Sequence, residues 1–141
     1  MRKIRFRAKN AEGVWLEGSL ITDKYERSDG KQFDVAFIVD NLPCMEQPND
    51  MWTAKMHRVE PSTIGQHTSL FDKFGKPIYE GDILRVGEEK TLIEVRFVRG
   101  VFAFLWNGDL DDEFPCNAPT QEWADVIGNI HDNPKLIRRR N

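Results

Sequence analysis

The chain has 141 residues, of which 40% are hydrophobic, 11% aromatic and 30% charged. This composition is typical of a soluble globular protein and argues against a disordered chain. The formal net charge of −3 gives no general attraction to nucleic acid. The longest apolar run, residues 101–106, is far too short to cross a bilayer.

Cysteine usage indicates a reducing compartment. Cys44 and Cys116 are the two cysteines, and they lack the close spacing of disulfide-rich or zinc-binding sequences. The basic N-terminus also lacks the apolar segment of a signal peptide. We therefore expect a protein of the host-cell cytoplasm with free thiols, no metal and no cofactor.

Apolar and polar residues alternate with a period of two in the first part of the chain. Basic and apolar side chains alternate over residues 3–8, which predicts a half-buried strand. Turn residues follow, and residues 14–21 then favour the returning strand of a hairpin. Asp29-Gly30 predicts a second turn before a β-rich run over residues 33–39.

Two prolines mark the next segment. Pro43 and Pro48 indicate a loop or linker over residues 41–50. The pattern of residues 51–59 fits either a helical turn or a strand.

Glycines and turn residues shape the second part of the chain. Asp72-Lys73-Phe74-Gly75 predicts a tight turn in which Gly75 has a positive φ. Glu80-Gly81-Asp82 predicts a sharp turn into a strand, with the Asp82 carboxylate bonded to nearby backbone amides. Arg99-Gly100 predicts a two-residue hairpin loop.

The strand predicted over residues 101–106 has no polar face, so both of its sides need cover, from the N-terminal hairpin or from another subunit. The acidic run at residues 109–113 favours the start of a short helix. Residues 123–130 predict a closing strand, with close packing or a bulge at Gly128. Asn133-Pro134 predicts the start of a brief helix.

Three segments together resemble a known family. They are Arg2-Lys3-Ile4-Arg5-Phe6-Arg7-Ala8, the run from Ser62 to Val86, and Val126-Ile127-Gly128-Asn129-Ile130-His131-Asp132-Asn133-Pro134. The chain resembles the YopX family, whose members are small phage and prophage proteins of uncharacterised function. His67 and His131 stand where that family more usually has an aromatic residue, and Ser69 stands where it usually has glycine.

The resemblance implies a structural role for the signature residues. These are Gly65, Gln66, Thr68, Asp72, Gly75, Tyr79, Gly81, Asp82, Gly128 and Asn129. We expect a mainly β protein. Residues 1–60 are predicted to form an N-terminal β-hairpin subdomain with a proline-containing linker. Residues 61–141 are predicted to form an SH3-like small β-barrel with short helical segments.

Catalysis is the least favoured function. His57, His67 and His131 with the two cysteines could supply zinc ligands, but none has the usual close spacing. Glu80, Asp82, Asp72 and His67 could serve a metal-dependent hydrolase. However, no nucleophile-elbow, Walker or zincin motif is present, so we expect a protein that is not an enzyme.

Nucleic-acid binding is the second interpretation. Arg5 and Arg7 point to one side of the first predicted strand, and the chain ends with Arg138, Arg139 and Arg140. Together they would form a patch that contacts phosphates without reading bases. Ordinary solvated charges explain the same pattern more simply.

A binding or assembly role is the favoured interpretation. Met51, Trp52, Met56 and Trp106 are candidate interface residues, because methionine and aromatic side chains are enriched in interface cores. The sequence therefore predicts a phage- or prophage-encoded, non-enzymatic binding or assembly protein. We expect it to form a homo-oligomer or to bind an unknown phage or host protein, without a membrane.

Overall fold

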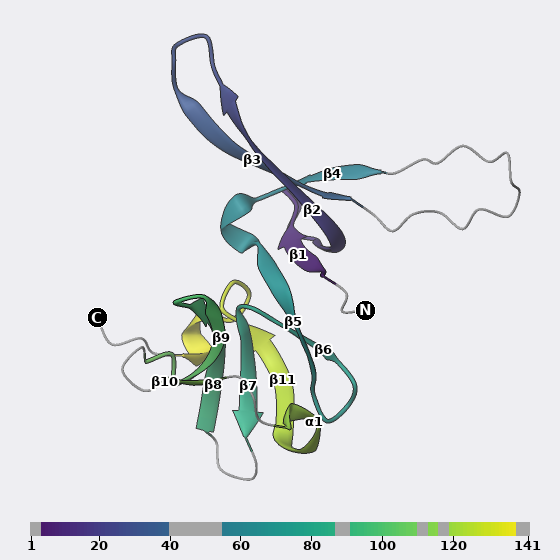
Figure 1. Ribbon diagram of the computed structural model, residues 1–141, viewed down its shortest axis with the longest axis vertical. Coiled ribbons are helices and arrows are strands. Elements are labelled where there is room, and N and C mark those ends of the chain that lie inside the picture. Colours follow the sequence, from purple (N-terminus) through teal and green to yellow (C-terminus); the bar gives the residue numbers. More distant parts are fainter. Residues whose placement is uncertain (1–3, 40–54, 87–90, 110–112, 116–118, 138–141) are drawn as a thin grey trace, which may run out of the picture. The chain divides into compact units, whose positions relative to one another are not determined.

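The computed structural model describes residues 4–39, 55–86, 91–109, 113–115 and 119–137 (Figure 1). Strands dominate these ranges and pair antiparallel, so the predicted mainly β class is confirmed. The chain divides into two compact units, Lys3–Gln66 and the part from His67 onward. The sequence interpretation had placed this boundary after residue 60. Among the described residues, none of the helices has the length and apolarity that a membrane span needs.

The N-terminal unit is one antiparallel sheet. Its elements are β1 (Phe6–Lys9), β2 (Trp15–Glu26), β3 (Gln32–Val39), β4 (Met56–Val59), the 3-10 turn η1 (Pro61–Thr63) and the first residues of β5 (Gly65–Phe71). The pairing order is β4-β3-β2-β1-β5. The stretch with an ambiguous pattern is therefore a strand over Met56–Val59, and Met51 and Trp52 lie outside the described residues.

The hairpin of β2 and β3 is longer than predicted. The two strands pair from Ser19 opposite Val39 to Glu26 opposite Gln32. β1 pairs only with the first part of β2, and β4 only with the last part of β3. The hairpin consequently continues beyond both neighbours as a two-stranded arm (Figure 1).

The two faces of this sheet differ. One face carries a small core of Ala8, Ala36, Ile38 and Val59, all at most 2% exposed. Strand residues alternate between faces, so their sequence neighbours lie on the other side. We call this other side the outer face.

The C-terminal unit contains a second antiparallel sheet. Its strands are β7 (Asp82–Val86), β8 (Thr91–Val98), β9 (Val101–Trp106), β10 (Glu113–Pro115) and β11 (Ala124–Asn129), in the order β10-β9-β8-β7-β11. The second half of β5 pairs with β6 (Pro77–Tyr79). Two short helical segments complete the unit, α1 (Thr120–Trp123) and η3 (Pro134–Leu136). The SH3-like barrel stays a prediction.

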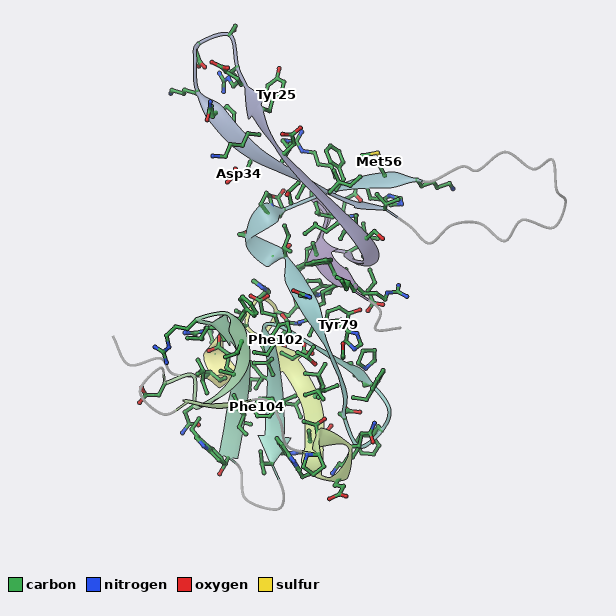
Figure 2. The ribbon with its side chains drawn as sticks, viewed as in Figure 1. Tyr25, Asp34, Met56, Tyr79, Phe102 and Phe104 are labelled. Atoms are coloured by element: carbon green, nitrogen blue, oxygen red, sulfur yellow. The ribbon has the colours of Figure 1, made fainter. Side chains whose placement is uncertain are left out.

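Both faces of this sheet are buried at its centre. Phe104, labelled in Figure 2, packs with Leu84, Ile93 and Val95 on one face and is 0% exposed. Its neighbour Leu105 is also 0% exposed and lies on the opposite face, because successive strand residues alternate. The prediction that this strand needs cover on two sides is confirmed at its centre.

Several predicted local features of this unit are correct, and two need correction. Arg99 and Gly100 both have positive φ and link β8 to β9 as a two-residue loop. Gly128 lies at a bulge of β11. However, Glu113 lies in β10 and not in a helix, and residues 110–112 lie outside the described residues. Trp123 ends α1 and does not begin the closing strand.

Candidate interaction surface

The carboxylate of Asp72 stabilises the turn of residues 72–76. Its Oδ1 accepts hydrogen bonds from the backbone N–H groups of Phe74 and Lys76, at 2.9 and 2.8 Å. Its Oδ2 accepts one from the N–H of Val126 on β11, at 3.2 Å. Gly75 has a φ of +80°, as predicted. Asp72 therefore joins the turn to the closing strand and is not exposed for chemistry.

These contacts change the acidity of Asp72. Burial raises the pKa of the carboxyl, but the backbone N–H groups of Lys76, Val126 and Phe74 and the charge of Lys76 lower it by more. The net result is a pKa below the ordinary value of 3.8. Asp72 is thus held in its charged form by the fold.

A second buried carboxylate supports the turn into β7. Asp82 Oδ2 accepts a hydrogen bond from the backbone N–H of Tyr79 at 2.7 Å, and Asp82 is 1% exposed. Gly81 has a φ of +93°. Its N–H donates to the carbonyl of Val95, and its carbonyl accepts from the N–H of Ile130. This turn is therefore bonded to two other parts of the unit.

The last signature segment is also a turn. Asn129 Oδ1 accepts from the backbone N–H groups of His131 and Asp132, and its own N–H donates to Asn133 Oδ1. A Cβ atom on Gly128 would lie 2.4 Å from Asn133 Oδ1. Close packing requires glycine at this bulge, as predicted.

The structure shows the surroundings of two residues that depart from the family pattern, Ser69 and His67. Ser69 has a φ of +69°, a conformation that glycine adopts without strain. The ring of His67 lies 5.2 Å from that of Tyr79 and 5.4 Å from that of Phe71. His67 thus packs as an aromatic residue would. Beside it, the Thr68 hydroxyl donates to the carbonyl of Ile78, while Gly65 and Gln66 pair with β1.

Structural contacts involve three of the four candidate hydrolase residues. Asp72 and Asp82 accept backbone hydrogen bonds, and His67 lies among aromatic rings. Within the described ranges, no three His, Cys, Asp or Glu residues gather where they could hold a metal ion. Cys44 and Cys116 lie outside those ranges.

These structural roles do not explain the exposed apolar residues on the outer face of the N-terminal sheet. Tyr25 lies directly opposite Phe33 at the far end of the arm, and the two are 59% and 40% exposed. Nearer the base, Ile21 lies opposite Phe37 and is 45% exposed. Met56 of β4 lies opposite Val39 and is 53% exposed. Pairing and alternation thus put a row of apolar side chains on one side of three strands.

Figure 2 labels two members of this row, Tyr25 and Met56. The sequence interpretation included Met56 but missed Ile21, Tyr25 and Phe33. The signal was present in the alternation of residues 33–39 and in the Asp29-Gly30 turn. That turn decides which residue of β2 lies opposite Phe33.

The outer face also contains a basic and aromatic cluster at β1. Strand pairing puts Arg7 opposite Glu17 and Lys9 opposite Trp15. The Arg7 guanidinium carbon lies 4.8 Å from the centroid of the Trp15 ring, and Lys9 Nζ lies 5.6 Å from it. Both cations therefore stack on one indole ring.

The other predicted site residues fall in both units or outside the described residues. Arg5 precedes β1 in the N-terminal unit and is half-buried, whereas Arg138, Arg139 and Arg140 lie outside the described residues. Trp106 packs against the core of the C-terminal unit. Of the predicted patch residues, the structure describes Arg5, Arg7 and Met56 in the N-terminal unit and Trp106 in the C-terminal unit.

Comparisons with known proteins agree with the resemblance seen in the sequence. A family profile described as YopX protein matches residues 5–138. The crystal structure of protein EF1440 from Enterococcus faecalis is 25% identical, with a TM-score of 0.51, over 96% of this chain and 99% of that one. The crystal structure of protein yopX from Bacillus subtilis is 18% identical, with a TM-score of 0.46, over 97% of this chain and 98% of that one.

No curated protein matches the chain. The family profile nevertheless covers nearly its whole length, including residues 5–8 of the first segment that carries the resemblance and all of the other two. This chain belongs to the YopX family.

Proposed function

We propose that this is a phage- or prophage-encoded, non-enzymatic assembly protein that binds a second copy of itself in the host cytoplasm. One observation carries the proposal, the exposed apolar row on the outer face formed by Ile21, Tyr25, Phe33 and Met56. Exposed apolar residues that adjoin one another on several strands are typical of a binding surface. The phage origin is what the YopX family resemblance implies.

The charges on the arm favour a second copy as the partner. The basic residues between Thr22 and Asp34 are Lys24, Arg27 and Lys31, and the acidic ones are Asp23, Glu26, Asp29 and Asp34. Both signs alternate along this segment, so the arm gives no strong field to attract a uniformly charged partner. A surface with both signs can complement its own copy around a two-fold axis.

The use of the acidic residues supports a non-enzymatic role. Asp72 accepts hydrogen bonds from backbone N–H groups through both carboxylate oxygens, and Asp82 accepts one through Oδ2. These bonds explain why the residues are buried without invoking a substrate.

Sedimentation velocity over a wide range of concentrations tests the proposal. We expect the wild-type mass to rise from monomer to dimer, and Phe33→Asp to stay monomeric because it puts a charge in the apolar row. Val14→Asp is the matched control, since Val14 is 51% exposed and lies in the turn before β2. It should dimerise like the wild type. A wild type that remains monomeric throughout would refute the proposal.

Nucleic-acid binding is the second candidate, and the stacking of Arg7 and Lys9 on Trp15 favours it. Binding would be weak, poorly sequence-specific and steeply lost with salt. We expect Arg5→Ser combined with Arg7→Ser to flatten the salt dependence more than Lys9→Ser does. Fluorescence anisotropy with single- and double-stranded DNA and RNA at low salt measures this. Absence of binding to all four would exclude the second candidate.

A further inference from the structure

Part of β3 has a free edge. β4 pairs with β3 only from Ala36 to Val39. Among the residues that the structure describes, no strand lies on that side of Gln32–Val35. This free edge belongs to the arm. It ends at Ala36, which pairs with Val59, the last residue of β4 before the chain continues into η1.

The hydrogen-bond pattern of the hairpin shows which groups point to this edge. The N–H of Arg27 donates to the carbonyl of Lys31 at the end of the arm, at 2.8 Å. Backbone groups alternate in direction along a strand, so those of Phe33 and Val35 point toward β2. The N–H and C=O groups of Gln32 and Asp34 therefore point to the free edge.

A hollow of about 480 Å³ adjoins the same edge. Its lining includes Asp34, Ala36 and Lys24 of the arm together with Pro61 and Ile64. The side of the arm that carries Asp34 and Lys24 is opposite the outer face, because these two residues form a cross-strand pair next to Tyr25 and Phe33. There is thus a hollow next to Asp34 at this edge, and among the described residues no strand pairs with Gln32–Val35 on that side.

We infer that two copies of the chain dimerise by antiparallel pairing of their β3 edges, with the two-fold axis at Phe33. This deepens the proposed function, on which it rests, by specifying how the second copy docks. Gln32 would lie opposite Asp34 of the second copy, and Asp34 opposite its Gln32. Each such pair exchanges the N–H and C=O groups that point to the edge.

Side chains support this register on the outer face. The two Phe33 side chains lie directly opposite each other across the axis. Each Phe33 already has Tyr25 opposite it within its own hairpin. The dimer therefore carries four aromatic rings in one row across four strands, and cross-strand aromatic pairs stabilise sheets.

Side chains on the opposite face also fit. The amide of Gln32 lies opposite the carboxylate of Asp34 from the second copy and can donate a hydrogen bond to it. This amide then enters the region of the hollow, where Lys24 is the cross-strand partner of Asp34.

Neighbouring registers are less favourable. Moving the axis to Asp34 would put two carboxylates opposite each other, which destabilises a strand pair. Moving it to Gln32 would bring the second copy's Asp34 opposite Gly30, beyond the end of β3. The axis at Phe33 uses the whole free edge without a like-charge pair.

Disulfide trapping tests the register. In a background with Cys44→Ser and Cys116→Ser, oxidised Phe33→Cys should form a covalent dimer, because directly opposite residues that do not exchange hydrogen bonds have Cα atoms about 4.5 Å apart. Val35→Cys alone should not, since the register puts Val35 opposite Lys31. Lys31→Cys combined with Val35→Cys keeps Phe33 and should also form the covalent dimer. A covalent dimer of the Val35→Cys variant would overturn the register. So would the absence of a covalent dimer from both Phe33→Cys and the Lys31→Cys, Val35→Cys double variant.

Asp34→Pro separates this inference from the proposed function. Proline removes the N–H that points to the edge but keeps the hydrogen bonds to β2. We expect the variant to sediment as a monomer under conditions where Asp34→Ala, which keeps that N–H, is a dimer of twice the mass. If Asp34→Pro dimerises like the wild type, the edge pairing is wrong while docking on the outer face stands. A monomeric wild type would overturn both.

Discussion

The two sheets of this protein differ in the burial of their faces. In the C-terminal sheet, the neighbours Phe104 and Leu105 lie on opposite faces and are both 0% exposed. In the N-terminal sheet, Ile38 is 0% exposed, whereas Tyr25 and Phe33 are 59% and 40% exposed. The residues of the family signature lie mainly in the C-terminal unit, where they build turns. The exposed apolar surface that could bind a partner lies on the N-terminal sheet.

The difference in burial between the two sheets predicts the largest contrast in the free energy of unfolding when strand side chains are truncated to alanine. Phe104→Ala and Leu105→Ala should each lower the free energy of unfolding by about 2–5 kcal/mol, because each leaves a cavity in a packed layer. Tyr25→Ala should change the monomer's stability by about 0.5 kcal/mol or less. Urea unfolding at a concentration that keeps the chain monomeric measures all three. A cost below about 1 kcal/mol for Leu105→Ala would contradict burial of the second face.

The next largest contrast in stability is expected between a carboxylate of the C-terminal unit, Asp72, and one of the N-terminal unit, Asp34. Asp72→Asn keeps one acceptor oxygen but turns an amide N–H₂ toward the N–H of Val126, so we expect a loss of about 1.5–3 kcal/mol at neutral pH. Asp34→Asn, exposed on the arm, should cost the monomer no more than about 0.5 kcal/mol. Equal effects of the two substitutions would contradict the structural role of Asp72.

The pH dependence sharpens this contrast. The pKa of Asp72 is lowered in the folded chain, so its stabilising effect is complete above the unfolded pKa of about 3.9 and is lost as the pH falls through the folded pKa. The stability difference between wild type and Asp72→Asn should therefore shrink below about pH 4. A difference that is constant from neutral pH to pH 2 would show that the charge of Asp72 is not involved.

A smaller effect is expected at the tip of the Asp72 turn. Gly75 has a φ of +80° and nothing within 4 Å of the Cβ position, so Gly75→Val is penalised by backbone strain alone. We expect a loss of about 1–2 kcal/mol. Gly75→Asn should lose less, because asparagine tolerates positive φ. Thermal melts of the two variants at one protein concentration compare them, and an unchanged melting temperature for Gly75→Val would refute the argument.

The smallest effect has the opposite sign. Ser69 has the positive φ that the family usually satisfies with glycine. Ser69→Gly should stabilise the protein by about 0.5–1 kcal/mol, after the greater freedom of glycine in the unfolded chain is subtracted. Ser69→Ala should give no such gain, since alanine has the same steric restriction. Chemical denaturation of the three proteins decides the point.

The sequence predicted local features better than surfaces. Gly75, Arg99-Gly100 and the bulge at Gly128 depend on local backbone conformation, which short sequence patterns report directly. The exposed row depends on pairing between strands. Tyr25 falls outside the strand predicted to end at residue 21, so the prediction did not put it opposite Phe33. Of the two arginines predicted on the first strand, Arg7 lies in β1 and Arg5 precedes it. Whether more distant arginines join them depends on tertiary structure.

Hydrogen exchange of the wild-type chain at low and high concentration tests the central claim most directly. We expect the amides of Gln32 and Asp34 to become more protected as the concentration rises, because they become bonded to the second copy. Amides of β8 and β9, already within the buried sheet, should exchange at the same rate in both samples. Concentration-dependent protection confined to the C-terminal unit, with the arm unchanged, would contradict the account.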